Sequence, residues 1–151
     1  RTTVADAATA VTTVKFDAAS MLSLNGMSFR KAVGSSGADT IKAGGTQQTL
    51  TGGRGVDTLV GFAGGYDTFS DTASRLTGDT IANFVTSDVI DITNMGFGRG
   101  TTLTAVASGS NTKVTVTAGS TQSAFTMAGS WSASGFHLAS DGAAGTLLTH
   151  S

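Results

Sequence analysis

Large apolar residues recur at nine-residue intervals in the middle of the chain. Ile41, Leu50 and Leu59 are nine residues apart, and Phe69 follows after one additional residue. Each is flanked by polar or small residues, a short alternation that is typical of a brief strand with one side chain directed inward. We therefore expect residues 34–70 to form successive short strands with these four side chains as their inner ladder.

Hydrophobic positions outside this region predict further strands. Residues 71–95 are expected to continue the stack with longer turns, and residues 12–33 to form irregular coils that cap its first repeat. From residue 101 the pattern changes to strands of about six residues, which either extend the stack or close it as an antiparallel sheet. These strands are expected at 101–107, 112–118, 123–128, 135–139 and 145–150.

The turns between the apolar positions carry a glycine and aspartate motif. Residues 52–60 match the nonapeptide G-G-x-G-x-D-x-U-x at every fixed position, where U is a large apolar residue. Glycine permits the positive φ angles that turn carbonyl oxygens toward one point. An aspartate carboxylate then completes an oxygen ligand set of the kind that calcium prefers.

Neighbouring units repeat this motif in part. Residues 34–42 keep the first and fourth glycine, the aspartate and the apolar residue. Residues 43–51 keep the length but have Gln48 in place of the aspartate, and residues 61–70 are a stretched copy. Four consecutive units in near register indicate a repeat rather than a chance match.

The repeat length predicts where a metal ion would bind. In a roll of nine-residue half-turns, units on the same side are 18 residues apart and stack at a spacing of roughly 4.8 Å. Asp39 and Asp57 have this separation, so their loops should be adjacent and share a calcium ion, with a poorer site at the loop 61–67. The candidate metal-site residues are Gly34, Gly37, Asp39, Gly52, Gly53, Gly55, Asp57, Gly64, Gly65 and Asp67.

Three further aspartates, Asp79, Asp88 and Asp91, follow the repeats. They could form another metal site, with Asp88 and Asp91 sharing a cation, or they could cap turns, which is a common role of aspartate. Turn capping is the favoured interpretation. The turn 70–75 has no glycine and is expected to end the roll.

These repeats resemble the hemolysin-type (RTX) calcium-binding repeats of proteins secreted by Gram-negative bacteria. Residues 78–84 and 88–92 are similar to the D-x-I-x-x-F…D-x-I-D-L segment that commonly follows such repeats, and residues 125–148 resemble the C-terminal regions of such proteins. The resemblance covers about residues 34–151. It implies an all-β fold: a parallel β-roll or β-solenoid with bound Ca²⁺, followed by a C-terminal β-strand module.

The expected domain organisation has three parts. Capping coils occupy residues 1–33, a calcium-binding β-roll residues 34–95, and a β module containing the cap and the secretion signal residues 96–151. The resemblance implies the C-terminal region of a larger secreted, extracellular or cell-surface protein. A type I secretion exporter would be a transient partner, and the chain would fold on calcium after export.

Composition narrows the functional classes. A net charge of −1 gives no reason to expect nucleic acid as a partner, and no apolar run reaches the ~20 residues that membrane insertion requires. Cysteine and a G-x-S-x-G motif are absent, so catalysis is not expected. Seven of the ten aspartates lie between positions 39 and 91, a crowding of charge that bound calcium would relieve.

Two other functions remain open. Trp131 lies in a polar turn, where its ring could stack on a sugar or fold over the edge of the core. The first possibility would suit a carbohydrate-binding or adhesion module that recognises polysaccharide. Alternatively, a flat solenoid edge could pair with copies of the same chain and build a surface layer or fibre.

Overall fold

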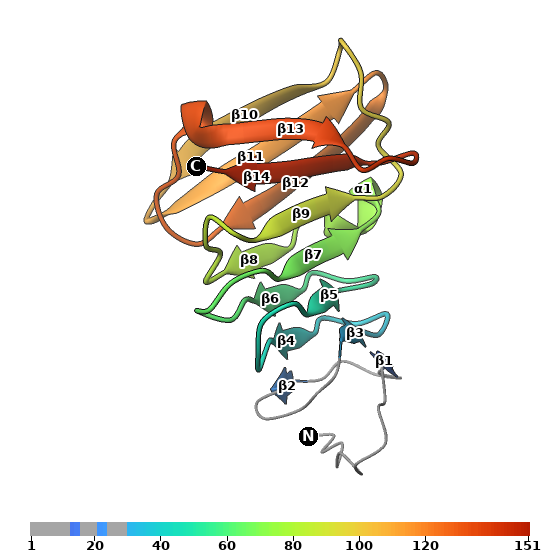
Figure 1. The fold of residues 1–151 in the computed structure, drawn as a ribbon, viewed down its shortest axis with the longest axis vertical. Coiled ribbons are helices and arrows are strands. Elements are labelled where there is room, and N and C mark those ends of the chain that lie inside the picture. Colours follow the sequence, from blue (N-terminus) through green and yellow to red (C-terminus); the bar gives the residue numbers. More distant parts are fainter. Residues whose placement is uncertain (1–12, 16–20, 24–29) are drawn as a thin grey trace.

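The computed structural model describes residues 13–15, 21–23 and 30–151, and side chains from residue 30 onward. Within this part the protein is mostly β, with strands stacked along the long axis of the molecule (Figure 1). No helix among these residues is long and apolar enough to cross a membrane. Much of the expected capping region, namely residues 1–12, 16–20 and 24–29, lies outside the described residues.

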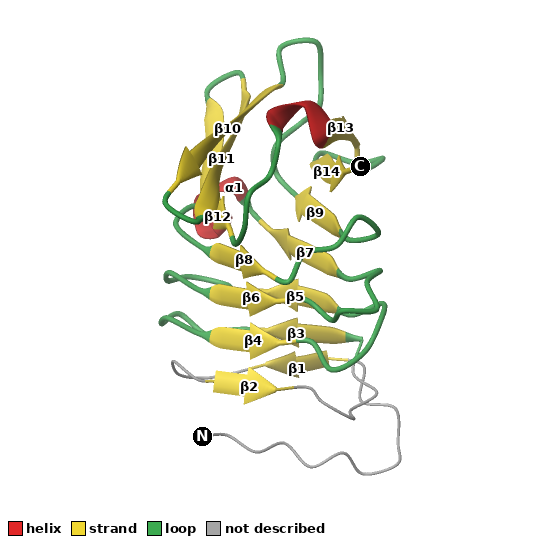
Figure 2. Ribbon diagram, turned by 90° about the vertical axis from the view of Figure 1, so that its left-hand side faces the viewer, coloured by secondary structure: helices red, strands yellow, loops and turns green. Residues whose placement is uncertain are grey.

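Nine short strands of the described chain alternate between two sheets. Odd-numbered strands belong to one sheet and even-numbered strands to the other, and each of β1 to β7 pairs in parallel with the strand two places further along (Figure 2). The strands are β1 (Thr13–Lys15), β2 (Met21–Ser23), β3 (Lys31–Val33), β4 (Thr40–Lys42), β5 (Thr49–Thr51), β6 (Thr58–Val60), β7 (Thr68–Asp71), β8 (Thr80–Ala82) and β9 (Val89–Ile92).

Strand register follows the repeat length and then departs from it. Thr40 of β4 pairs with Thr58 of β6, 18 residues later, but Thr58 pairs with Thr80 of β8, 22 residues later. The longer turn contains a short helix, α1 (Ala73–Leu76), which buries Ala73 and Leu76. The turn 70–75 is expected to end the roll, but this is wrong for the parallel pairing, which continues from β6 to β8. The buried side chains of α1 hold this longer turn in place, whereas the earlier turns rely on glycine.

Longer antiparallel strands extend both sheets at the C-terminal end. β10 (Thr102–Ser108), β11 (Asn111–Ala118) and β12 (Thr121–Met127) form a meander, and β12 joins β8 in parallel. After a 3₁₀ turn (Ala133–Gly135), β13 (Phe136–Ser140) and β14 (Thr146–His150) form a hairpin, and β14 joins β9 antiparallel. The five strands expected here are confirmed within two residues at each end, and they both extend the stack and pack as antiparallel sheets.

The hydrophobic core lies between the two sheets. All four side chains of the expected inner ladder are buried, which confirms that prediction. Each fully buried aliphatic or aromatic side chain of this kind contributes about 1.5–3 kcal/mol relative to an exposed one. The core continues toward the C-terminus through Ile81, Phe84, Ile90, Ile92, Met95, Val114, Val116, Phe125, Met127 and Leu148.

Candidate metal centre

Buried aspartates connect successive turns on one side of the molecule. The N–H of Asp39 donates to Oδ1 of Asp57 (2.8 Å), and the N–H of Asp57 donates to Oδ1 of Asp79 (2.8 Å). We call Asp39, Asp57 and Asp79 the first aspartate stack. Its members are almost fully buried, and the carboxylates of Asp57 and Asp79 each hold their own turn against the preceding one. The expected adjacency of the loops 34–39 and 52–57 is confirmed.

An equivalent stack lies at the opposite turns. The N–H of Gln48 donates to Oδ1 of Asp67 (2.9 Å), and the N–H of Asp67 donates to Oδ1 of Asp88 (2.9 Å). We call these three residues the second stack. Gln48 thus occupies the place of an aspartate, as the repeat alignment indicates.

Sequence reasoning did not recognise Asp79 and Asp88 as further members of these stacks. They follow the preceding aspartates by 22 and 21 residues, so an 18-residue period does not find them. A local signal was nevertheless present. Asp79 and Asp88 each stand two residues before a buried isoleucine, in the same Asp-x-apolar arrangement as Asp57 before Leu59.

Glycine allows the loops 34–39 and 52–57 to approach closely. Gly53 and Gly55 have φ angles of +94° and +124°. A Cβ at Gly53 would lie 2.5 Å from the carbonyl oxygen of Ser35, and a Cβ at Gly55 would lie 2.5 Å from that of Gly37. Carbonyl oxygens of the first loop therefore lie so close to the second loop that no side chain would fit at these two glycines.

The remaining candidate glycines of these two loops also pack tightly. The N–H of Gly34 donates to the carbonyl oxygen of Thr51 (2.8 Å), and a Cβ at Gly34 would overlap the carbonyl oxygen of Gly52. A Cβ at Gly52 would overlap the Asp57 carboxylate. The loops thus bring backbone and carboxylate oxygens together, the ligand type that calcium favours.

Asp57 differs from its counterparts in one hydrogen bond. In the other three repeats, the N–H of the second residue donates to the side chain at the aspartate position of the same loop: Ser35 to Asp39 (2.6 Å), Gly44 to Gln48 (2.8 Å), and Phe62 to Asp67 (2.7 Å).

In the repeat 52–60, the N–H of Gly53 donates instead to Oδ2 of Asp71 (2.8 Å). Oδ2 of Asp57 is consequently buried without a hydrogen-bond partner. A buried unpaired carboxylate oxygen is unfavourable, and a hard cation would satisfy it. Sequence reasoning missed Asp71 because it lies at the end of β7, outside the motif, although it follows Gly53 by the repeat length of 18 residues.

The second stack fits a cation less well. Both carboxylate oxygens of Asp67 accept backbone N–H groups. The glycines of its loop also have different surroundings. A Cβ at Gly64 would meet the Phe62 ring, and one at Gly65 would overlap the hydroxyl of Ser87. Side chains therefore occupy the place that carbonyl oxygens have beside Gly53 and Gly55.

Burial and mutual repulsion make the charged form of these aspartates unfavourable. Burial raises the pKa of Asp57, and the neighbouring carboxylates of Asp39 and Asp71 raise it further, against the hydrogen bond from Asp39 N–H. Burial raises the pKa of Asp79 from 3.8 to about 7, with added repulsion from Asp57 and Asp71. Such a cluster favours a compensating positive charge, from a proton or a cation.

The remaining aspartates have separate environments. Oδ2 of Asp88 accepts the N–H of Val85 (2.9 Å), so Asp88 caps its own turn, the favoured interpretation of the sequence. Asp91 lies within β9, where its Oδ2 accepts the Ser70 hydroxyl (3.4 Å) and its Oδ1 is buried without a partner. Burial raises the pKa of Asp67, Asp88 and Asp91, and Asp141 adds repulsion at Asp91.

Trp131 is partly buried against the core. Its Nε1–H donates to the carbonyl oxygen of Ala128 (2.8 Å), and its ring packs edge-on against Phe84 and His150, with centroid distances of 5.4 and 4.9 Å. The indole thus folds over the edge of the core, the second of the two placements considered from the sequence.

No group of three or more His, Cys, Asp or Glu side chains in the described part of the chain is arranged to hold a metal ion. A cation at the first stack would therefore depend on backbone carbonyls together with Asp57. No protein-family model matches this chain, and no curated protein matches it. Function is accordingly inferred from the site.

Proposed function

We propose that this chain is a calcium-binding β-roll module of the RTX type. The observation that supports it most directly is the unpartnered, buried Oδ2 of Asp57, in a loop whose Gly53 and Gly55 closely approach carbonyl oxygens of the preceding loop. Parallel pairing at 18-residue spacing between β4 and β6 agrees with the coil length of such a roll. Residues 34–95 would form the roll, residues 1–33 its cap, and residues 96–151 the C-terminal module.

The residues that would hold the ion come from both loops of the first stack. Oδ2 of Asp57 would be a carboxylate ligand, and the carbonyl oxygens of Ser35 and Gly37 in the preceding loop are backbone candidates. Bound calcium would supply the positive charge that the buried carboxylates lack. Asp39 and Asp79 would then be held as anions within the stack.

This arrangement can couple folding to location. Where calcium is scarce, the crowded carboxylates of Asp57, Asp71 and Asp79 oppose compaction, and the segment would stay open enough to pass a type I secretion exporter. Outside the cell, a ligand at about 100 times its Kd adds about 2.7 kcal/mol to the free energy of unfolding. We therefore place the chain at the C-terminus of a larger, secreted or cell-surface protein of a Gram-negative bacterium, in a non-catalytic role.

Calcium titration of chelator-treated protein tests the proposal. Far-UV circular dichroism should show a transition from coil to β at sub-millimolar to millimolar calcium, and calorimetry should show binding heat. Asp57→Asn removes the unpaired carboxylate oxygen and should weaken calcium affinity about tenfold or more. Asp67→Asn is the matched control, because Asp67 has the same place in its repeat with both oxygens already paired.

Two results would contradict the proposal. One is a full β spectrum in chelator together with no heat on addition of calcium. The other is an equal loss of affinity in both variants, which would move the metal away from the first stack.

A further inference from the structure

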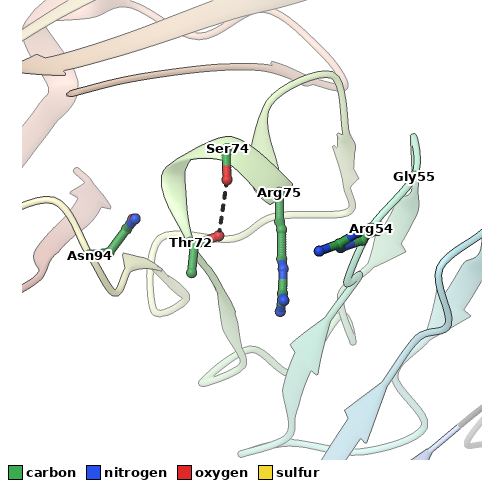
Figure 3. Close-up of a pocket in the computed structure, with 6 residues that line it drawn as sticks. All are labelled: Arg54, Gly55, Thr72, Ser74, Arg75 and Asn94. Carbon is green, nitrogen blue, oxygen red and sulfur yellow. Dashed lines mark hydrogen bonds between the residues drawn. The ribbon is translucent and has the colours of Figure 1, made fainter. Parts of the chain in front are cut away.

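A polar pocket of about 470 Å³ lies between α1 and the loop 52–57. Side chains from three separate segments of the chain converge on it (Figure 3). Its lining residues are Arg54, Gly55, Thr72, Ser74, Arg75 and Asn94. Volumes of 300–1,000 Å³ are typical of sites for small ligands.

The pocket is lined by two guanidinium groups, and Arg75 is the one paired with a carboxylate. Arg75, whose side chain is 46% exposed, lies 4.0 Å from Oδ1 of Asp71. That carboxylate already accepts the N–H of Thr72 and the N–H of Gly53, both at 2.8 Å. The long ion pair therefore leaves guanidinium N–H groups of Arg75 available to a ligand, and the exposed Arg54 adds a second guanidinium.

The other lining side chains add neutral donors. The hydroxyls of Thr72 and Ser74 are 3.5 Å apart. Oδ1 of Asn94 accepts the N–H of Ala73 (2.7 Å), which fixes the amide and leaves its NH₂ group as the end that can donate. Two guanidinium groups beside hydroxyl and amide donors suit a ligand that is anionic at one point and hydroxylated elsewhere.

We propose that this pocket binds one acidic sugar unit of a polysaccharide, a pyranose bearing a carboxylate or a sulfate. Arginine binds both groups through paired N–H donors, while the hydroxyls of Thr72 and Ser74 and the amide of Asn94 meet the sugar hydroxyls. This inference goes beyond the calcium proposal, since it assigns the module a ligand at a different set of side chains. Arg54 and Asp57 share one loop, so the folded loop positions both sites.

Calorimetry of the folded protein at saturating calcium tests this site. The probes are a hyaluronan tetrasaccharide, a sulfated maltotetraose, neutral maltotetraose and inorganic sulfate. Arg54→Gln and Arg75→Gln should each weaken binding of an acidic oligosaccharide about tenfold. Arg99→Gln is the matched control, because Arg99 is an exposed arginine outside the pocket and its variant should bind as the unmodified protein does.

Tighter binding of either acidic probe supports the proposal and identifies whether carboxylate or sulfate is preferred. Absence of binding by both acidic probes would overturn it, as would equal binding of neutral maltotetraose. An equal loss in the Arg99→Gln variant would indicate general charge attraction rather than this pocket. Inorganic sulfate binding as tightly as the sulfated sugar would remove the sugar from the assignment. Circular dichroism of each variant separates these outcomes from a failure of calcium-dependent folding.

Discussion

At the scale of single residues, the environment of Asp57 depends on where one backbone N–H points. Gly53 donates to Asp71, whereas the equivalent N–H groups of the neighbouring repeats donate within their own loops. The difference leaves one buried carboxylate oxygen unpaired. The hydrogen bonding of the motif aspartate therefore depends on a contact from the next coil as well as on the motif itself.

Gly55→Ala should destabilise the fold. Gly55 has a φ of +124°, and an added Cβ would lie 2.5 Å from the Gly37 carbonyl oxygen. We expect the free energy of unfolding to fall by about 1–3 kcal/mol, measured by urea denaturation at fixed calcium. Gly45→Ala is the control, since a Cβ there meets nothing within 4 Å; it should change stability by less than about 1 kcal/mol. Equal effects of the two substitutions would refute this explanation.

At the scale of elements, the short strands depend on their neighbours. Strands of three residues, such as β4 and β6, bury one side chain each and cannot be stable alone. β14 pairs antiparallel with β9, and β12 pairs in parallel with β8, so these two strands continue the two sheets of short strands. The C-terminal strands are thus structurally continuous with the repeats.

Leu148→Ala tests this continuity. Leu148 of β14 is fully buried and lies opposite Ile90 of β9, so the substitution should lower the free energy of unfolding by about 2–5 kcal/mol. Val106→Thr on β10 is the control, because that side chain is 61% exposed, and its effect should stay within about 0.5 kcal/mol. If Leu148→Ala destabilises only the C-terminal strands, hydrogen exchange will show β4 and β6 still protected, and the continuity would be disproved.

At the scale of the whole molecule, five described aspartates have pKa values raised by burial: Asp57, Asp67, Asp79, Asp88 and Asp91. Between pH 3.8, the ordinary pKa, and the raised pKa of each group, the folded protein therefore binds more protons than the unfolded chain. For Asp79 this range extends to about pH 7. Stability from these groups is complete below pH 3.8 and is lost as pH rises through the folded pKa values. Metal-free protein should therefore fold and melt on heating at pH 5, and should be less stable, or already coil, at pH 8.

Calorimetric scans in chelator at the two pH values provide the measurement. Asp79→Asn should flatten the dependence near pH 7, because it removes the carboxyl with the highest pKa while keeping an acceptor for the Asp57 N–H. Added calcium should reduce the loss at pH 8, since a cation favours the charged form of nearby carboxylates. A melting temperature that rises with pH in chelator would contradict the raised pKa values.

The amino-acid sequence by itself determined the inner ladder, the strand positions and the adjacency of Asp39 and Asp57. These depend on local spacing, because a short strand directs alternate side chains to opposite faces and a constant repeat length stacks equivalent residues. Tertiary structure alone decided three further features: the hydrogen bond from the Gly53 N–H to Asp71, the continuation of both sheets across longer turns, and the position of Arg54 and Arg75 in one pocket. Gly53 and Asp71 are 18 residues apart, the repeat length, but only packing decides that the Gly53 N–H donates to Asp71 and not to Asp57. The other two features join residues 21 or 22 positions apart, and these contacts follow from packing in three dimensions rather than from the 18-residue period.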